Sequence, residues 1–350
     1  MKVGNLSQTV WRRSVLKQLH RKEELQLLPP VPGERCGVER TGDGNIRIHA
    51  HATAAAKQVT AVKYAVFQAV NDVACRGAMP EKVDLQVLFP PSAEETDVRM
   101  MVGSVQSLCD EFGLQLTGVQ AQVNPAVERT ITTVTVSGMA VAQCLIRMQD
   151  AKPGLEIVMC GFAGLEGSLR IAGEHRNELE KRFVPAFLSQ MDGLERYLNQ
   201  NETIQTAQNQ SKAAFHIFAM QQAAAGGIFA ALWELAEAAG IGMEIDLKKI
   251  LIRQETVEVC EYYQLNPYQM TSAGCILFLT DHAEKLIEIL EESGARAERL
   301  GVTTAGNARV ITSGEEQRYL ERPAPDEWMR FLEQELRADK CRAEESERLG

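Results

Sequence analysis

The sequence predicts an α/β protein built from two domains. Strand-type and helix-type hydrophobic patterns alternate along the chain, and the alternation starts again after the turn Lys152-Pro153-Gly154. A chain of 350 residues with 45% apolar content is also long enough to bury two cores. We expect an N-terminal helix (1–28), two α/β domains (29–150 and 151–320) and a C-terminal helix with a charged tail (321–350).

The first half of the chain predicts a strand–helix–strand–helix–strand–strand domain behind an N-terminal helix. Apolar side chains at helical spacing follow Ser7, a good capping residue, so residues 7–24 are predicted to be an amphipathic helix. Its cationic face is either a solvated surface or a wall facing a phosphate. After a Pro-rich break, Ile46 and Ile48 alternate with polar residues as in a half-buried strand. The further expected elements are a helix at 59–75, a strand at 83–89, a helix at 95–111, and strands at 114–123 and 130–141.

The second half repeats this alternation. Its expected strands are 155–160, 215–220, 244–252, 276–280 and 296–302. Helices are expected around 168–180, 182–199, 226–239 and 282–293, with a last amphipathic helix beyond Pro325.

Composition excludes several classes of function. The net charge of −10 argues against nucleic acid and anionic membranes as partners, since both need a basic face. No apolar run approaches the roughly 20 residues that span a bilayer. The 8 cysteines contain no C-x-x-C pair, so neither a zinc site nor a disulfide framework is expected. These features predict a cytoplasmic protein.

Three segments resemble motifs of one superfamily. Segment 71–80 (NDVACRGAMP) resembles the N-D-[LIV]-A-x-x-G-A-x-P pattern of the aminoimidazole-ribonucleotide (AIR) synthase-related, PurM-like superfamily. Segments 161–168 (GFAGLEGS) and 266–274 (NPYQMTSAG) resemble motifs of its hydrogenase expression/formation protein E branch, which is a carbamoyl dehydratase. This resemblance covers roughly residues 30–312 and implies a two-domain fold whose N-terminal domain dimerises through its sheet. It also implies a cleft in which carboxylates hold Mg²⁺ on ATP.

The resemblance supplies candidate site residues. Glu34 and Asp72 are the matching carboxylates that remain, and they are the candidates for catalysis. Glycine-rich turns before helices present backbone N–H groups to phosphate, although such glycines also serve ordinary tight turns. The implied nucleotide- or phosphate-binding residues are Arg35, His51, Asn71, Asp72, Gly118, Gln120, Gly164, Gly167, Ser168, Gln222, Gly226 and Gly227.

Most of the family's carboxylates are replaced in this chain. Arg35 and His51 stand where acids are expected, Gln120 lies in a third polar position, and Gln222 and Ala225 replace both acids of the D-x-[TS]-[ED]-G-G signature. Mg²⁺ prefers carboxylate, phosphate and water oxygens, so no metal site is expected. Arginine would instead attract a phosphate directly.

The terminal cysteine that accepts the carbamoyl group in the protein E branch is also absent. This chain ends in Leu349-Gly350, and its last thiol is Cys341.

These departures favour a member of the family that has lost Mg·ATP chemistry, a pseudoenzyme that binds a nucleotide or another phosphate without metal or acts as a scaffold. Two alternatives stay open: an ATP-dependent maturation-type enzyme with a rebuilt site, and a pure interaction scaffold with an empty cleft. A homodimer is expected from the resemblance, and a maturation factor or an enzyme is a further expected partner.

Overall fold

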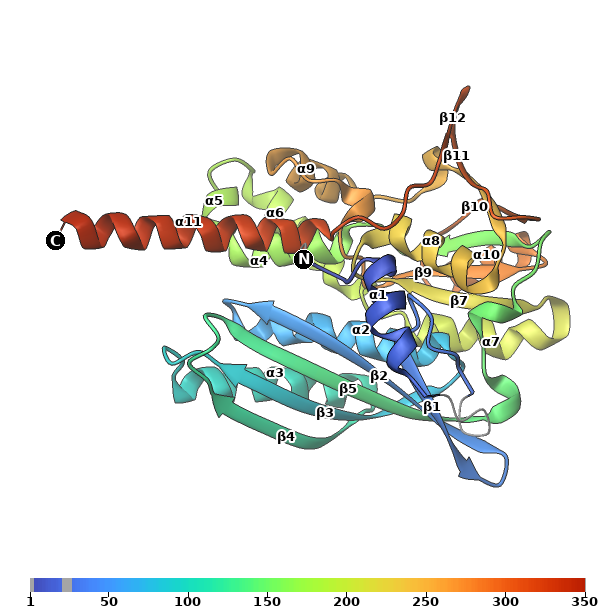
Figure 1. Cartoon of the computed structure of the whole chain (residues 1–350), viewed down its shortest axis with the longest axis horizontal. Coiled ribbons are helices and arrows are strands. Elements are labelled where there is room, and N and C mark those ends of the chain that lie inside the picture. The colour runs from blue at the N-terminus through green and yellow to red at the C-terminus, as the bar shows by residue number, and fades with distance from the viewer. Residues whose placement is uncertain (1–2, 21–26, 350) are drawn as a thin grey trace.

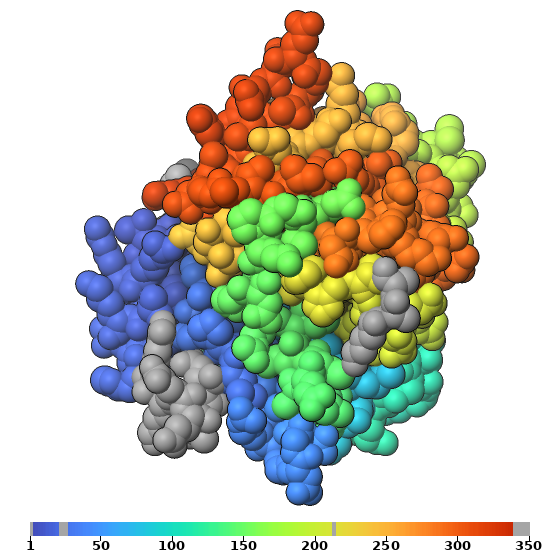
Figure 2. All heavy atoms as spheres, turned by 90° about the vertical axis from the view of Figure 1, so that its right-hand side faces the viewer, coloured from blue at the N-terminus to red at the C-terminus, as the bar shows by residue number. Residues whose placement is uncertain are grey.

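The computed structural model describes residues 3–20 and 27–349, and it describes side chains except at 212–214 and 339–349. Within this part, the chain forms two sheets with helices packed on them, which confirms the α/β prediction (Figure 1). One sheet belongs to the first half of the chain and the other to the second. The stretch around residue 150, green in Figure 2, runs across the surface from the N-terminal half to the C-terminal half.

The N-terminal sheet has the strand order β1-β2-β5-β3-β4, in which only the β3–β4 pair is parallel. Helices α2 and α3 lie on one face of it (Figure 1). Its elements are β1 (Cys36–Gly42), β2 (Asn45–Ala56), α2 (Val62–Cys75), β3 (Met79–Phe89), α3 (Glu95–Phe112), β4 (Gln115–Val123) and β5 (Thr130–Val141).

Strand alternation explains how this sheet is covered. Side chains of β2 and β5 such as Ile46, Ile48, Val134 and Val136 are fully buried under α2, because every second side chain points to the same face. The alternate side chains are exposed or half-buried. The outer face of the sheet is therefore open in the described structure, while the inner face carries the core.

The C-terminal sheet has the order β12-β11-β8-β10-β6-β9-β7. Its strands are β6 (Glu156–Cys160), β7 (Ile217–Ala223), β8 (Gly242–Asp246), β9 (Cys275–Thr280), β10 (Ala297–Thr304), β11 (Arg309–Ser313) and β12 (Glu316–Tyr319). The helices of this half are α4 (Leu165–Glu174), α5 (Arg176–Leu179), α6 (Pro185–Asp192), α7 (Asn201–Ala214), α8 (Gly227–Ala239), α9 (Gln254–Tyr262) and α10 (Ala283–Glu292).

Several predicted boundaries were wrong. The helix expected at 182–199 is α6 followed by a 3-10 helix (Gly193–Tyr197), and the strand expected to reach residue 252 ends at Asp246. Helices α7 and α9 and strands β1, β11 and β12 were not predicted. Helix α7 is rich in Asn, Gln and Thr, so its apolar period is weak although Ile204 and Ala207 are fully buried.

Helix α1 (Gln8–Ser14) lies near the C-terminal half, whereas helix α11 (Glu327–Leu349) packs with its first turns on both halves and its far end projects from the molecule (Figure 1). Helix α1 is capped by Ser7 as predicted, but it ends at Ser14 and a 3-10 helix (Leu16–Gln18) follows. The predicted continuation through 21–24 lies outside the described residues. Helix α11 buries Trp328 and Phe331 in its first turns. No helix in the described part is both long and apolar enough to cross a membrane.

Candidate functional site

The segment before β1 brings Glu34 and Arg35 to the junction between the two halves of the chain, where each forms an ion pair with a residue at or near the end of α2. The side chains of Glu34 and Arg76 are each 3% exposed, and Arg76 Nε donates to both Glu34 oxygens at 3.1 and 3.2 Å. Arg76 also donates to the Met220 carbonyl on β7. The pKa of Arg76 is raised: burial lowers it, and the nearby Glu34 carboxylate more than offsets that effect. Arg76, at the end of α2, was not among the predicted site residues, although it lies inside the 71–80 motif.

Arg35 makes the second ion pair of this junction, with Asp72 of α2. Its Nε and one terminal nitrogen donate to the two Asp72 oxygens at 2.8 and 2.9 Å, the bidentate geometry that suits guanidinium and carboxylate. The same terminal nitrogen donates to the Gln222 carbonyl at 2.7 Å. Burial acts to lower the pKa of Arg35, but Asp72 raises it well above its usual value. The guanidinium that was predicted to meet a phosphate is therefore already paired.

Neutral amides complete the network. Gln222 is fully buried on β7, and its amide nitrogen donates to Asp72 Oδ1 at 2.9 Å. Its amide oxygen accepts from Asn71 at 2.9 Å and from the Gly274 N–H at 3.2 Å. Of the predicted site residues, Glu34, Arg35, Asn71, Asp72 and Gln222 are thus brought together in one buried network that joins the two halves of the chain.

His51, Gly118 and Gln120 lie elsewhere, on the N-terminal sheet. The cross-strand register runs from His51 on β2 through Thr135 and Asp84 to Gly118 on β4, so His51 and Gly118 are three strand spacings, about 14 Å, apart. His51 shares a hydrogen bond of 2.8 Å with Thr135 Oγ1, and partial burial together with the nearby His49 lowers its pKa. Asp84 is an exposed carboxylate of this row that the predictions left out.

The backbone N–H groups of Gly164 and Gly167, in the first glycine turn, already have hydrogen-bond partners within the protein. The Gly164 N–H donates to Ser272 Oγ at 2.7 Å, and the Gly167 N–H donates to the Thr271 carbonyl at 3.1 Å. Ser168 is fully buried and donates to the Leu165 carbonyl. A Cβ on Gly167 would meet the Met270 sulfur at 2.2 Å. These contacts favour the ordinary interpretation of these glycines, which is close packing in a tight turn.

Glu166, inside the same turn, is a buried charge that sequence reasoning missed. It is fully buried and accepts hydrogen bonds from Gln68, Thr271 Oγ1 and the Ala273 N–H, and it pairs with Arg170 at 2.6 Å. The feature of the sequence that could have identified Glu166 is its position directly before Gly167 in the GLEGS motif. Its satisfied contacts indicate a structural role that ties α4 to the N-terminal half.

The second glycine turn, at the start of α8, is also occupied. The Gly226 N–H donates to Asp326 Oδ2 at 2.5 Å, and the Gly227 N–H donates to the Ala224 carbonyl at 2.9 Å. Asp326, 3% exposed, also accepts from the Trp328 N–H and so caps α11. Burial raises the pKa of Asp326 to about 7, against the lowering effect of the Gly226 hydrogen bond. A carboxylate of the protein's own chain thus stands where the turn was predicted to bind phosphate.

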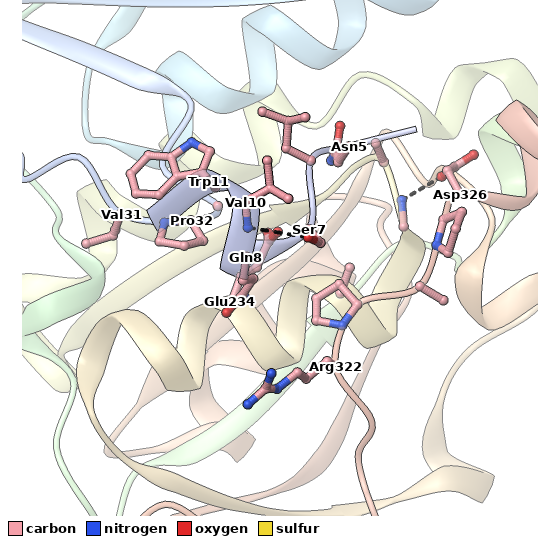
Figure 3. A pocket seen from close by; sticks show the side chains of 18 of the residues that line it. Asn5, Ser7, Gln8, Val10, Trp11, Val31, Pro32, Glu234, Arg322 and Asp326 are labelled. Carbon is pink, nitrogen blue, oxygen red and sulfur yellow. Dashed lines mark hydrogen bonds between the residues drawn. The ribbon is translucent and has the colours of Figure 1, made fainter. Parts of the chain in front are cut away.

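A cavity of about 750 Å³ opens beside this turn (Figure 3). It lies between α1, the segment before β1, the first turns of α8 and the segment that leads into α11. Glu234 of α8 contributes a carboxyl group whose pKa is about 7, because burial and Asp72 raise it more than Arg35 lowers it. Two of the predicted site residues, Glu34 and Gly226, line this cavity, whereas Glu234 was not predicted from the sequence.

One cluster has the residue types of a metal site. Ligand atoms of Glu174, His175 and Glu335 lie within 4.8 Å of one another. Arg129, however, pairs with both glutamates at 3.2 Å, and His175 Nε2 lies 2.5 Å from Glu335. Positive side chains of the protein already balance these carboxylates, so the cluster favours an ion-pair network over a bound cation.

The two halves of this fold correspond to the two domains of one family. The N-terminal domain of AIR synthase related proteins matches residues 40–143, and the C-terminal domain matches residues 152–313. The chain belongs to the AIR synthase related protein family.

Relatives in curated collections agree with this assignment. A protein of Methanocaldococcus jannaschii that is named as a putative hydrogenase expression/formation protein is 25% identical over 71% of this chain and 72% of its own length. Carbamoyl dehydratase HypE of Rhodobacter capsulatus is 26% identical over 72% of this chain and 71% of its own length. The resemblance to the hydrogenase expression/formation branch is therefore confirmed.

Solved structures share the fold. HypE in a HypE–HypF complex aligns with a TM-score of 0.66 at 18% identity, covering 82% of this chain and 93% of HypE. HypE in complex with ATP aligns with a TM-score of 0.62 at 17% identity, covering 93% of this chain and 94% of that HypE chain. These likenesses confirm the predicted two-domain, PurM-like architecture.

Proposed function

We propose that this protein is a HypE-like member of the family that has lost Mg·ATP chemistry and works as a binding or scaffold protein. The observation that carries the proposal is the bidentate pair between Arg35 and Asp72. Asp72 is one of two retained family carboxylates, and a guanidinium of the same chain neutralises it. A divalent cation at Asp72 would have to displace that guanidinium.

The second retained carboxylate supports the same proposal. Glu34 is paired with Arg76 and accepts from the Cys36 N–H at 3.0 Å, so its charge and its lone pairs are used within the fold. An ATP-dependent enzyme with a rebuilt site, the alternative function, would need Glu34 or Asp72 to leave these contacts. Phosphoryl transfer depends on metal ions and cations that neutralise the transferring phosphate, so a closed network of this kind disfavours it.

A nucleotide or another phosphate remains a candidate ligand within this proposal. It would reach Arg35 in competition with Asp72 and the Gln222 carbonyl, and it would not need Mg²⁺. An empty cleft, with function exerted only through surfaces, is the remaining form of the proposal.

We further propose a homodimer that forms through the open face of the N-terminal sheet. Exposed or half-buried polar side chains from β2, β5, β3 and β4 lie in register across this face, among them Thr53, Thr133, Gln86 and Gln120. The HypE–HypF complex makes a maturation protein a reasonable partner to test for this chain. We infer a cytoplasmic location from the reduced, mostly buried cysteines.

The proposal is tested by ATP turnover. We expect the purified protein, with Mg²⁺ and ATP, to stay far below ordinary enzyme rates of about 1 s⁻¹. Calorimetry with ATP in Mg²⁺ and in EDTA should give the same affinity or no binding in both. The control for an aspartate change is Asp110→Asn, on the exposed side of α3. Turnover near 1 s⁻¹ that Asp72→Asn abolishes and Asp110→Asn leaves intact would refute the proposal.

A further inference from the structure

The cavity at the start of α8 has the dimensions of a small-molecule site. Its volume of about 750 Å³ lies within the roughly 300–1,000 Å³ typical of ligand pockets. The N-terminal segment and the segment that leads into α11 both help to form it, since Gly4 lies against Pro325 and residues of α1 line the cavity. Figure 3 shows Gln8, the first residue of α1, next to Glu234, with the capping residue Ser7 beside it.

The cavity walls are largely apolar. They are contributed by side chains from three separate parts of the chain, namely Val10, Trp11, Val31, Pro32, Pro323 and Pro325. Such walls favour a ligand with an apolar body, because covering that body removes apolar surface from water.

Glu234 is the polar group that this arrangement leaves without a partner. Glu234 makes no hydrogen bond or ion pair with any residue that the structure describes. Its carboxylate lies close to Gly33, where an added Cβ would be 2.7 Å from Oε2; Gly33 also has a positive φ of 86°. The positive charge that acts on it is Arg35, whose guanidinium is committed to Asp72.

The other charged groups of the cavity do not neutralise Glu234. Glu34 and Asp326 are themselves carboxyl groups, which cannot neutralise another carboxylate. Arg322 lines the cavity but is exposed, so water screens its charge. Glu234 is therefore a carboxyl group of the cavity that no cation of the described structure contacts in an ion pair, although Arg35 acts on it from a distance.

A hydrogen-bond donor on α1, next to Glu234 in Figure 3, is also without a partner in the part of the chain that the structure describes. The amide nitrogen of Gln8, on α1, is buried and has no hydrogen-bond partner among the described residues. An unmatched donor and an unmatched acceptor facing one cavity are the polar groups that orient a ligand in such a site.

We propose that this cavity binds a small ligand with an apolar body and a cationic or amine-type nitrogen that donates to Glu234. The ligand supplies the direct ion pair that Glu234 lacks among the described residues, because the nearby Arg35 guanidinium is bonded to Asp72. An amidine or guanidine group suits the carboxylate best, because it donates two parallel hydrogen bonds. This site does not depend on the proposed loss of Mg·ATP chemistry, and it takes a ligand of opposite charge to phosphate.

Benzamidine is a suitable probe, since it joins an aromatic ring to a permanently charged amidinium. Benzoate is its control, with the same ring and the opposite charge. We expect calorimetry to detect benzamidine binding below about 10 mM and no benzoate binding. Glu234→Gln should weaken benzamidine at least tenfold, Glu234→Asp should weaken it less, and Glu284→Gln on the exposed side of α10 should leave it unchanged.

The dependence on pH gives a second readout that needs no variant. A carboxyl group with a pKa of about 7 is about tenfold more ionised at pH 8 than at pH 6, so benzamidine should bind about tenfold more tightly at pH 8. This dependence should vanish in Glu234→Gln; if it persists there, Asp326 is the acid and the assignment to Glu234 fails.

Absence of benzamidine binding, equal binding of benzoate, or binding untouched by Glu234→Gln would overturn the inference. Thermal unfolding of each variant shows whether it folds. ATP turnover tests the proposed function separately, so the failure of one proposal is distinguishable from the failure of the other.

Discussion

At the scale of single residues, the charged side chains at the junction between the two halves are paired with each other, Arg35 with Asp72 and Arg76 with Glu34. Arg35 occupies a position where the family resemblance implies an acid, and it pairs with the retained Asp72 in the same chain. Buried pairs of this kind are costly to break, because removing one partner leaves the other charge buried and unpaired. A structural role for Asp72 is therefore separable from a catalytic one by stability measurements.

We expect Asp72→Ala to lower the free energy of unfolding by roughly 3 kcal/mol, because Arg35 and Gln222 both lose a partner. Replacing both charges, Arg35→Leu with Asp72→Leu, should cost less than the sum of the two single changes. Urea denaturation followed by circular dichroism measures all of these values, with Asp110→Ala as an exposed control expected within about 0.5 kcal/mol of the parent. Additive costs would contradict direct pairing.

At the scale of elements, helix α11 is held by a polar cluster as well as by its apolar first turns. Glu335 of α11 contacts His175 at the end of α4 and Arg129 at the start of β5, so one side chain joins both halves to the C-terminal helix. The hydrogen bond that the His175 ring donates to Glu335 is the main cause of the raised pKa of His175. Burial acts to raise the pKa of Glu335, but His175, Arg129 and Lys57 together lower it.

This cluster predicts a pH-dependent contribution to stability. Because the pKa of His175 is raised, its contribution is fully present below the ordinary histidine value of about 6.5 and is lost as pH rises through the folded-state pKa. The pKa of Glu335 is lowered, so its contribution to stability depends on pH in the opposite direction. The Glu335 contribution is present above about pH 4.3 and is lost as the pH falls through the folded-state pKa.

We therefore expect His175→Gln to lower the melting temperature more at pH 6 than at pH 8.5. Differential scanning calorimetry at both pH values provides the comparison, and His20→Gln, at an exposed histidine, is the matched control. An equal loss at the two pH values would mean that His175 stabilises α11 by packing on Phe331 instead of by its charge.

At the scale of the whole molecule, the open face of the N-terminal sheet determines how copies would assemble. Helices α2 and α3 cover one face only, and β4 leaves Val119 and Val123 exposed at the sheet edge. Exposed edges and one-sided sheets are surfaces that proteins commonly cover with a second chain.

We predict a homodimer at micromolar concentration that Thr133→Arg converts to monomer, because an arginine on central β5 places bulk and charge in the middle of the face. Light scattering coupled to size exclusion measures the mass. Gln106→Arg, on the exposed side of α3, should leave the dimer intact. A monomeric parent protein, or a dimer that tolerates Thr133→Arg, would show that this face is not the interface.

The sequence by itself determined the elements whose hydrophobic period is local and strong. Strand β5 was predicted at its observed bounds, and α3 within one residue. The alternation of apolar and polar residues in a strand, and their helical spacing in a helix, depend only on residues close together in the sequence. The family motif in 71–80 likewise identified α2 and its polar end. The polar helix α7 and the short strands β11 and β12 carried little local signal and were missed.

Only the tertiary structure decided which charged groups meet. Arg35 reaches Asp72 across 37 positions, and Asp326 reaches the Gly226 N–H across 100 positions. The residue types at these positions permit either a phosphate-binding site or internal contacts with the protein's own carboxylates, since a guanidinium and a backbone N–H bind phosphate and carboxylate alike. Which acceptor is present depends on where distant segments lie after folding, and local sequence patterns do not encode that arrangement.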